Sequence, residues 1–161
     1  NRTTAFILNP PAIKSKKGRE IHYTVGIIMK SANNADKLDD YINTLTPQKL
    51  NKSKIAFSDK YENMVAYEIK GNDIYKDKGG SHMYMIGIER NNPMYPGLLL
   101  ENPVTLPDGD SNKVTYYTAT ESKDRFKGKI FYAILLDSCE DIHEQSLSVF
   151  RTLFENQIII E

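Results

Sequence analysis

The segment Glu20-Ile21-His22-Tyr23-Thr24-Val25-Gly26-Ile27-Ile28-Met29-Lys30 decides the fold of this chain. Every second position of the segment carries an apolar side chain, and these positions are Ile21, Tyr23, Val25, Ile27 and Met29. Such alternation is typical of a β-strand that turns one face toward a core. We therefore predict one continuous strand over residues 20–30.

Shorter apolar segments on both sides of this strand also favour extended structure. Residues 54–57 and 64–69 are separated by a polar, turn-forming loop and predict a hairpin. Residues 114–120 are predicted to pair with residues 129–136 across another polar turn. The remaining predicted strands are residues 5–8, 83–89 and 158–160.

Two helices are predicted from apolar residues at helical spacing. The first covers about residues 34–46 and takes its N-cap from Asn33 or Asn34. The second covers about residues 139–155, where Ser138 with Asp141 three residues later resembles a capping box.

The order of these elements predicts an α+β fold. Strands outnumber helices and do not alternate regularly with them, which favours a mainly antiparallel sheet of about six to eight strands with two inserted helices. A length of 161 residues is usual for one domain, so we expect a single α+β domain over residues 1–161. No apolar run reaches the roughly 18 residues of a transmembrane helix, so no membrane span is predicted.

Charge and cysteine content limit the classes of function. The chain holds 21 Lys and Arg against 21 Asp and Glu, which disfavours a nucleic-acid binder with a wholly basic surface. These charges are uneven, since residues 1–80 hold fourteen basic against nine acidic side chains and residues 81–161 hold seven against twelve. The single cysteine excludes an intrachain disulfide and a zinc site of several thiolates. The sequence starts at Asn1 rather than Met, so we expect a processed or truncated start, and the cellular location stays open.

Two segments favour a binding or interaction module. A basic connector at residues 14–19 suits contact with an anionic ligand and contains Lys14, Lys16, Lys17 and Arg19. A long loop at residues 91–112 is rich in proline, and a connection of that length in a compact domain is usually functional. The loop residues expected to contact a partner, most simply another protein, are Met94, Tyr95, Leu98 and Leu99. The oligomeric state stays open.

Two short motifs give an alternative function. In His22-Tyr23-Thr24 the imidazole and the hydroxyl are two positions apart, so both point to the same side of a strand. His82-Met83-Tyr84 repeats this spacing, with Tyr84 in place of Ser or Thr, on a strand that could lie beside the first. The pair resembles the two His-x-[Ser/Thr] motifs of the two-histidine phosphoesterases. The resemblance implies a small phosphodiester hydrolase with His22 and His82 as acid and base, and with Thr24 and Tyr84 contacting phosphate.

No cofactor and no metal are predicted. Glycine-rich phosphate loops, paired metal-binding histidines and the G-x-S-x-G elbow are missing. Cys139 falls in the first turn of the second predicted helix, where the helix dipole can lower a thiol pKa, and His143 follows four residues later without a recognisable third group. The run Gly80-Ser81-His82-Met83 also matches a common remnant of vector cloning, so an engineered join is an open alternative there.

Overall fold

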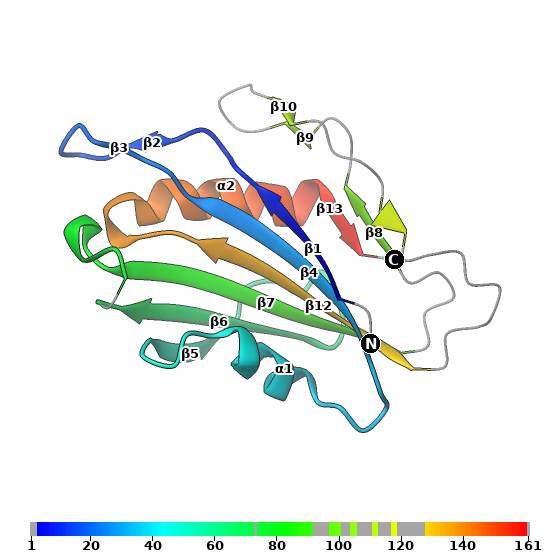
Figure 1. Cartoon of the computed structure of the whole chain (residues 1–161). Helices are drawn as coiled ribbons and strands as arrows, with labels where there is room; N and C mark the ends of the chain where they lie inside the picture. Colours follow the sequence, from blue (N-terminus) through cyan, green and yellow to red (C-terminus); the bar gives the residue numbers. More distant parts are fainter. Residues whose placement is uncertain are drawn as a thin grey trace.

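A six-stranded antiparallel sheet forms the centre of the computed structural model in Figure 1. The structure describes residues 3–72, 74–91, 97–100, 104–105, 111–112, 117–118 and 128–160. The strand order of the main sheet in these residues is β1-β4-β12-β7-β6-β5. Its strands are β1 (Thr3–Leu8), β4 (Thr24–Ala32), β5 (Asn51–Ile55), β6 (Met64–Gly71), β7 (Ser81–Asn91) and β12 (Lys129–Asp137). The prediction of a mixed fold with a mainly antiparallel sheet is confirmed.

Two α-helices accompany this sheet in the described part of the chain. They are α1 (Leu38–Leu45) and α2 (His143–Asn156), and a short 3-10 turn, η2 (Glu140–Ile142), leads into α2. A second 3-10 turn, η1 (Lys76–Lys78), lies between β6 and β7. Neither α-helix in the described segments has the length and apolar content needed to cross a membrane.

Short strands pair outside the main sheet. β2 (Ile13–Lys14) and β3 (Glu20–Ile21) form a small hairpin. β8 (Gly97–Leu100) lies between β11 (Tyr117–Thr118) and β13 (Ile158–Ile160), while β9 (Val104–Thr105) pairs with β10 (Ser111–Asn112). The predicted pairing of residues 114–120 with 129–136 is therefore wrong for the described residues, since β11 pairs with β8 and β12 pairs with β4 and β7.

Each face of the main sheet carries its own apolar core. The core under α2 (the α2-side core) includes Phe150 and Phe154 of the helix, and the core under α1 (the α1-side core) includes Tyr41 and Ile42. The central strands β7 and β12 contribute to both cores by alternation, because successive side chains of a strand point to opposite faces. Strands covered on both faces read as nearly continuous apolar runs, which explains why the sequence of β12 shows no polar alternation.

A glycine in β7 allows α1 to lie close to the sheet. A Cβ atom added at Gly87 would lie 2.9 Å from Ile42 Cδ1 and 3.1 Å from Leu38 Cδ1. Both contacts are closer than ordinary packing, so the absent side chain sets the distance between the helix and the strand.

The segment predicted as one strand, residues 20–30, is divided into β3 and β4. β1 ends at Leu8, opposite Val25, because the following prolines cannot donate to a ladder. Before Thr24 the chain leaves the main sheet and joins the β2–β3 hairpin. Ile21 and Tyr23 remain buried, so the predicted burial pattern is right although the strand is interrupted.

Both predicted helix caps are wrong. α1 begins later than expected, with Lys37 at its N-cap and no side-chain cap, and the Asn33 carbonyl accepts from the Asp36 N–H in a preceding turn. The N-cap of α2 is Ile142. Ser138 is 2.7 Å from the Ser146 hydroxyl instead, so a tertiary contact has replaced the local cap.

Candidate functional site

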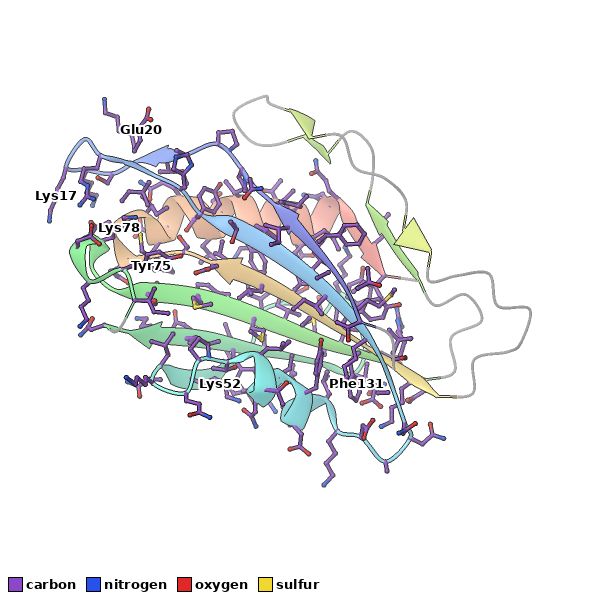
Figure 2. All side chains as sticks on the ribbon, viewed as in Figure 1. Lys17, Glu20, Lys52, Tyr75, Lys78 and Phe131 are labelled. Carbon is purple, nitrogen blue, oxygen red and sulfur yellow. The ribbon has the colours of Figure 1, made fainter. Side chains whose placement is uncertain are left out.

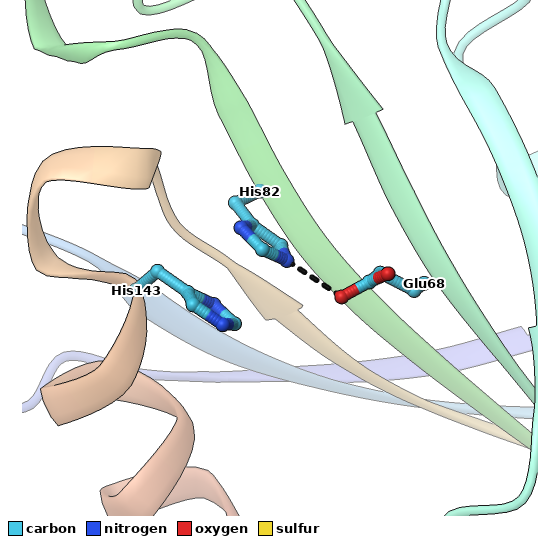
Figure 3. A group of neighbouring side chains, drawn as sticks. All are labelled: Glu68, His82 and His143. Atoms are coloured by element: carbon cyan, nitrogen blue, oxygen red, sulfur yellow. Dashed lines mark hydrogen bonds and ion pairs between the residues drawn. The ribbon is translucent and has the colours of Figure 1, made fainter.

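A cluster of polar side chains lies under the first turn of α2, at one end of the sheet. It comprises Glu68 of β6, His82 and Tyr84 of β7, Glu140 of η2 and His143 of α2. Glu68 is directly opposite Tyr84 in the antiparallel register, and His82 is two residues away on the same face of β7. Two strands and the start of a helix therefore bring these groups together, and Figure 3 shows three of them, Glu68, His82 and His143.

His82 is the most enclosed member of the cluster, with 2% of its surface exposed. Its Nδ1 lies 2.5 Å from Glu140 Oε2, and its Nε2 lies 2.8 Å from Glu68 Oε2. Carboxylates accept hydrogen bonds, so both contacts are made when both ring nitrogens carry protons. The ring is thus held at both nitrogens, between an acidic group on β6 and one on η2.

His143 stacks directly on His82. The ring centroids are 3.5 Å apart and the planes differ by 3°. Burial lowers the pKa of His143, and the adjacent His82 lowers it further. Its Nδ1 is buried and has no hydrogen-bond partner, while its Nε2 lies 3.5 Å from the Tyr84 hydroxyl. His143 is therefore favoured as a neutral imidazole with a free lone pair.

Glu68 is held as a carboxylate by its neighbours. The hydrogen bond with His82 lowers the pKa of Glu68 most, and the hydrogen bond from Tyr84 adds to this. The Tyr84 hydroxyl donates to Glu68 Oε2 over 2.7 Å, and burial and this carboxylate raise the pKa of Tyr84. Tyr84 therefore stays a neutral donor beside a charged oxygen.

The three groups offer a ligand set for a metal ion. One donor atom from each of Glu68, His82 and His143 lies within 4.8 Å of the other two. Bonds of about 2.0–2.1 Å to a tetrahedral zinc ion place two donors about 3.3 Å apart. For His82 Nε2 and Glu68 Oε2, now 2.8 Å apart, a small separation would meet this spacing. One of the two stacked imidazoles would also have to rotate, so that both in-plane lone pairs point to the same ion. Glu68 keeps 28% of its side chain exposed, which leaves it room to move.

A pocket of about 320 Å³ adjoins this cluster on the side of the β2–β3 hairpin. One wall belongs to the turn of the hairpin and contains Ser15, Lys16 and Lys17. The other wall belongs to η2 and the start of α2 and contains Glu140, Asp141, His143, Glu144 and Gln145. Two members of the polar cluster, Glu140 and His143, are thus also walls of the pocket.

The structure does not bring together the two predicted histidine motifs, residues 22–24 and residues 82–84. His22 is exposed between β3 and β4, while His82 is buried in β7, and β12 separates β4 from β7 in the sheet. Val25 belongs to the α2-side core, so alternation turns Thr24 toward the opposite face from Tyr84. His82 and Tyr84 keep their predicted neighbourhood, but their partners are Glu68, Glu140 and His143.

The basic connector forms the β2–β3 hairpin, where Figure 2 labels Lys17. Lys14 is exposed on β2, and Arg19 forms an ion pair with Asp77 at 3.1 Å. Lys16 and Lys17 are exposed and line the pocket. The anionic ligand expected at this connector stays a prediction.

The protein-binding role of the 91–112 loop also stays a prediction. Met94 and Tyr95 lie outside the described residues. Leu98 and Leu99 belong to β8, where their backbones pair with Ile160 and Ile159 of the last strand.

Sequence reasoning missed Glu68, Glu140 and the role of His143. A signal for Glu68 was present, because it follows Met64 and Ala66 on the apolar face of the predicted strand 64–69. The Cys139 and His143 pair, in contrast, does not form a reactive thiol site. Cys139 is buried, and this burial raises its thiol pKa, opposite to the effect expected from a helix dipole.

Comparison of the chain with protein-family models, with curated proteins and with solved structures found no match.

Proposed function

We propose that the protein binds a divalent transition-metal ion, with zinc as the best fit, through His82, His143 and Glu68. The observation that carries this proposal is the convergence of two imidazoles and one carboxylate within 4.8 Å. Two histidines with one acidic residue form the protein ligand set of several zinc and non-haem iron enzymes. Imidazole donors favour zinc, copper, iron or nickel over magnesium and calcium, which prefer oxygen.

The protonation states of His143 and Glu68 support metal binding. A metal ligand has to be a neutral imidazole or a carboxylate. The lowered pKa values of His143 and Glu68 favour these forms before any ion arrives. To hold an ion, His82 would release its Nε2 proton to solvent and give up its contact with Glu68, while its Nδ1–H would continue to donate to Glu140.

The partners of the ligands also support the proposal. Metal-binding histidines almost always donate their second ring N–H to a carboxylate, a carbonyl or water, which fixes the tautomer and the ring orientation. Glu140 occupies this position for His82, and Tyr84 donates to the Glu68 carboxylate. Three protein ligands leave one tetrahedral position for water or a substrate, as in catalytic rather than structural zinc sites.

The test is metal content and affinity. Chelator-treated protein is titrated with Zn²⁺ by calorimetry and with Co²⁺ by visible absorption, and one equivalent is expected to bind. His143→Ala is the main variant, because His143 Nδ1 has no partner and removal of the ring leaves fewer polar groups unpaired than removal of His82. Loss of this ligand is expected to weaken binding by more than about 100-fold, and Glu140→Ala by about 10–100-fold.

His22→Ala is the matched control, since His22 is an exposed histidine that does not belong to the ligand cluster. It is expected to bind one equivalent with unchanged affinity. A wild-type protein that binds no metal, or a folded His143→Ala variant with unchanged affinity, overturns the proposal. Circular dichroism of each variant confirms that the fold is retained.

A further inference from the structure

We infer that the pocket between the β2–β3 hairpin and the start of α2 binds a small zwitterionic ligand of the amino-acid or dipeptide class. This ligand site does not need the proposed metal. Only its coupling to the metal, described below, rests on the proposed function.

The charges of the pocket are opposite on its two walls. Lys16 and Lys17 lie on the hairpin wall, and Asp141 and Glu144 lie on the helix wall. Within the described segments, no ion pair shorter than 4 Å joins these walls. The opposite charges therefore line one space without neutralising each other directly.

This arrangement selects a ligand with both signs of charge. Glu140 already pairs with His82, so the four remaining charges of the walls sum to zero. A simple anion would meet the acidic wall, and a simple cation would meet the lysines. A carboxylate directed to Lys16 and Lys17 with an ammonium group directed to Asp141 and Glu144 satisfies both walls, and charge-assisted hydrogen bonds are the stronger kind.

The volume of the pocket limits the size of the ligand. At about 320 Å³ it falls at the lower end of the range typical for small-molecule sites, about 300–1,000 Å³. An amino acid or a dipeptide suits this space, whereas a folded protein partner would bind over a broader surface.

The pocket shares two residues with the proposed metal site. A ligand in the pocket contacts His143, a proposed metal ligand, and Glu140, which orients His82. Binding in the pocket is therefore expected to change metal affinity, and by linkage the metal changes ligand affinity by the same factor.

The test uses glycylglycine as the zwitterionic probe on chelator-treated protein, so that the peptide cannot bind through a metal. N-acetylglycine lacks the ammonium group and glycinamide lacks the carboxylate. Each analogue is expected to bind about tenfold more weakly or worse than glycylglycine, the factor for loss of one charge-assisted hydrogen bond. Equal binding of either analogue, or no binding of glycylglycine, overturns the inference.

Variants on each wall complete the test. The double variant Lys16→Ala/Lys17→Ala and Glu144→Gln are each expected to weaken glycylglycine binding about tenfold. Lys14→Ala and Glu155→Gln are matched controls, because both residues are exposed outside the pocket lining. An unchanged affinity in both wall variants also overturns the inference.

Metal content separates the two proposals. The wall variants are expected to keep one equivalent of Zn²⁺, whereas His143→Ala loses it. Absence of glycylglycine binding with normal Zn²⁺ binding refutes the ligand site alone. Glycylglycine binding by a protein that takes up no Zn²⁺ refutes the proposed function alone.

Discussion

Ser146→Ala is expected to destabilise the protein by about 1–3 kcal/mol, because it leaves a buried hydroxyl without a partner. Ser146 is fully buried in α2, and Ser138, directly after β12, is 2% exposed. The Ser146 hydroxyl has one proton, which it donates to the His143 carbonyl over 3.2 Å. Either hydroxyl can donate in the 2.7 Å contact between them, and we assign Ser138 as the donor because the carbonyl bond uses the Ser146 proton.

Because Ser138 is assigned as the donor, the two single substitutions are expected to lower the free energy of unfolding by different amounts. In Ser146→Ala the Ser138 donor loses its acceptor and stays buried, so the full cost of an unsatisfied group applies. In Ser138→Ala the Ser146 hydroxyl keeps its bond to the His143 carbonyl, and the expected cost is only about 0.5–1.5 kcal/mol. The double variant leaves neither hydroxyl unpaired, so its cost falls below the sum of the two by about 1 kcal/mol.

Urea unfolding followed by circular dichroism measures these differences. With a slope of about 2 kcal/mol per molar urea, a loss of about 2 kcal/mol lowers the midpoint by about 1 M. Ser148→Ala, on the exposed side of the same helix, is the control and is expected to change the midpoint little. A Ser138→Ala cost equal to that of Ser146→Ala, or strictly additive costs in the double variant, would refute the assigned donor and acceptor.

Two further predictions concern the packing and the charge of the sheet. Gly87→Ala is expected to cost about 1–3 kcal/mol by forcing Ile42 and α1 away from β7. Gly26→Ala, whose added Cβ would meet its nearest neighbour at an ordinary 3.7 Å, should change thermal stability little, and equal losses in both variants would contradict the packing explanation. Burial raises the pKa of Asp137 although the Tyr75 hydroxyl donates to it. The negative charge of Asp137 therefore disfavours the folded state once the pH exceeds the pKa of this carboxyl group in the unfolded chain. Asp137→Asn should therefore raise the free energy of unfolding at pH 7, with the gain vanishing below about pH 3, where both states are protonated; a gain that persists unchanged at low pH would point to another cause.

The sequence predicted the positions of the strands and helices better than it predicted which strands pair. Periodicity reports which side chains are buried, and the continuous apolar runs of β7 and β12 were correctly placed in strands for that reason. The pairing of β12 with β4 and β7 depends on contacts between distant segments, which local alternation does not encode. The cap predicted for the second helix failed for a related reason, since the Ser138 hydroxyl forms a tertiary hydrogen bond in place of a local one.

The candidate site was predicted only in part. His82 and Tyr84 were chosen for their spacing on a strand, and this local geometry is correct. Their partners come from β6 and from the start of α2, and no fixed spacing in the sequence links these elements to β7. His143 falls three positions before Ser146 and seven before Phe150, on the buried side of α2, which was the available signal for an inward-facing histidine.

The glycine pair before β7 explains how the cluster is assembled. Gly79 and Gly80 have φ values of 81° and 91°, a region that favours glycine. A Cβ at Gly80 would lie 2.6 Å from the Gly71 carbonyl oxygen, and one at Gly79 would lie 2.9 Å from the Glu140 Cβ. The loop can therefore pack directly on η2, where the Gly80 carbonyl accepts from the Glu140 N–H over 3.0 Å.

This packing places the Glu140 carboxylate on His82 and involves each residue of the run Gly80-Ser81-His82. Gly80 adopts a positive φ angle that residues with a side chain rarely adopt, and the Ser81 hydroxyl donates to the Ile74 carbonyl. His82 is held at both ring nitrogens by carboxylates from two other elements. Three consecutive residues thus satisfy three separate requirements of the surrounding structure. The run is therefore part of the packing that forms the candidate site.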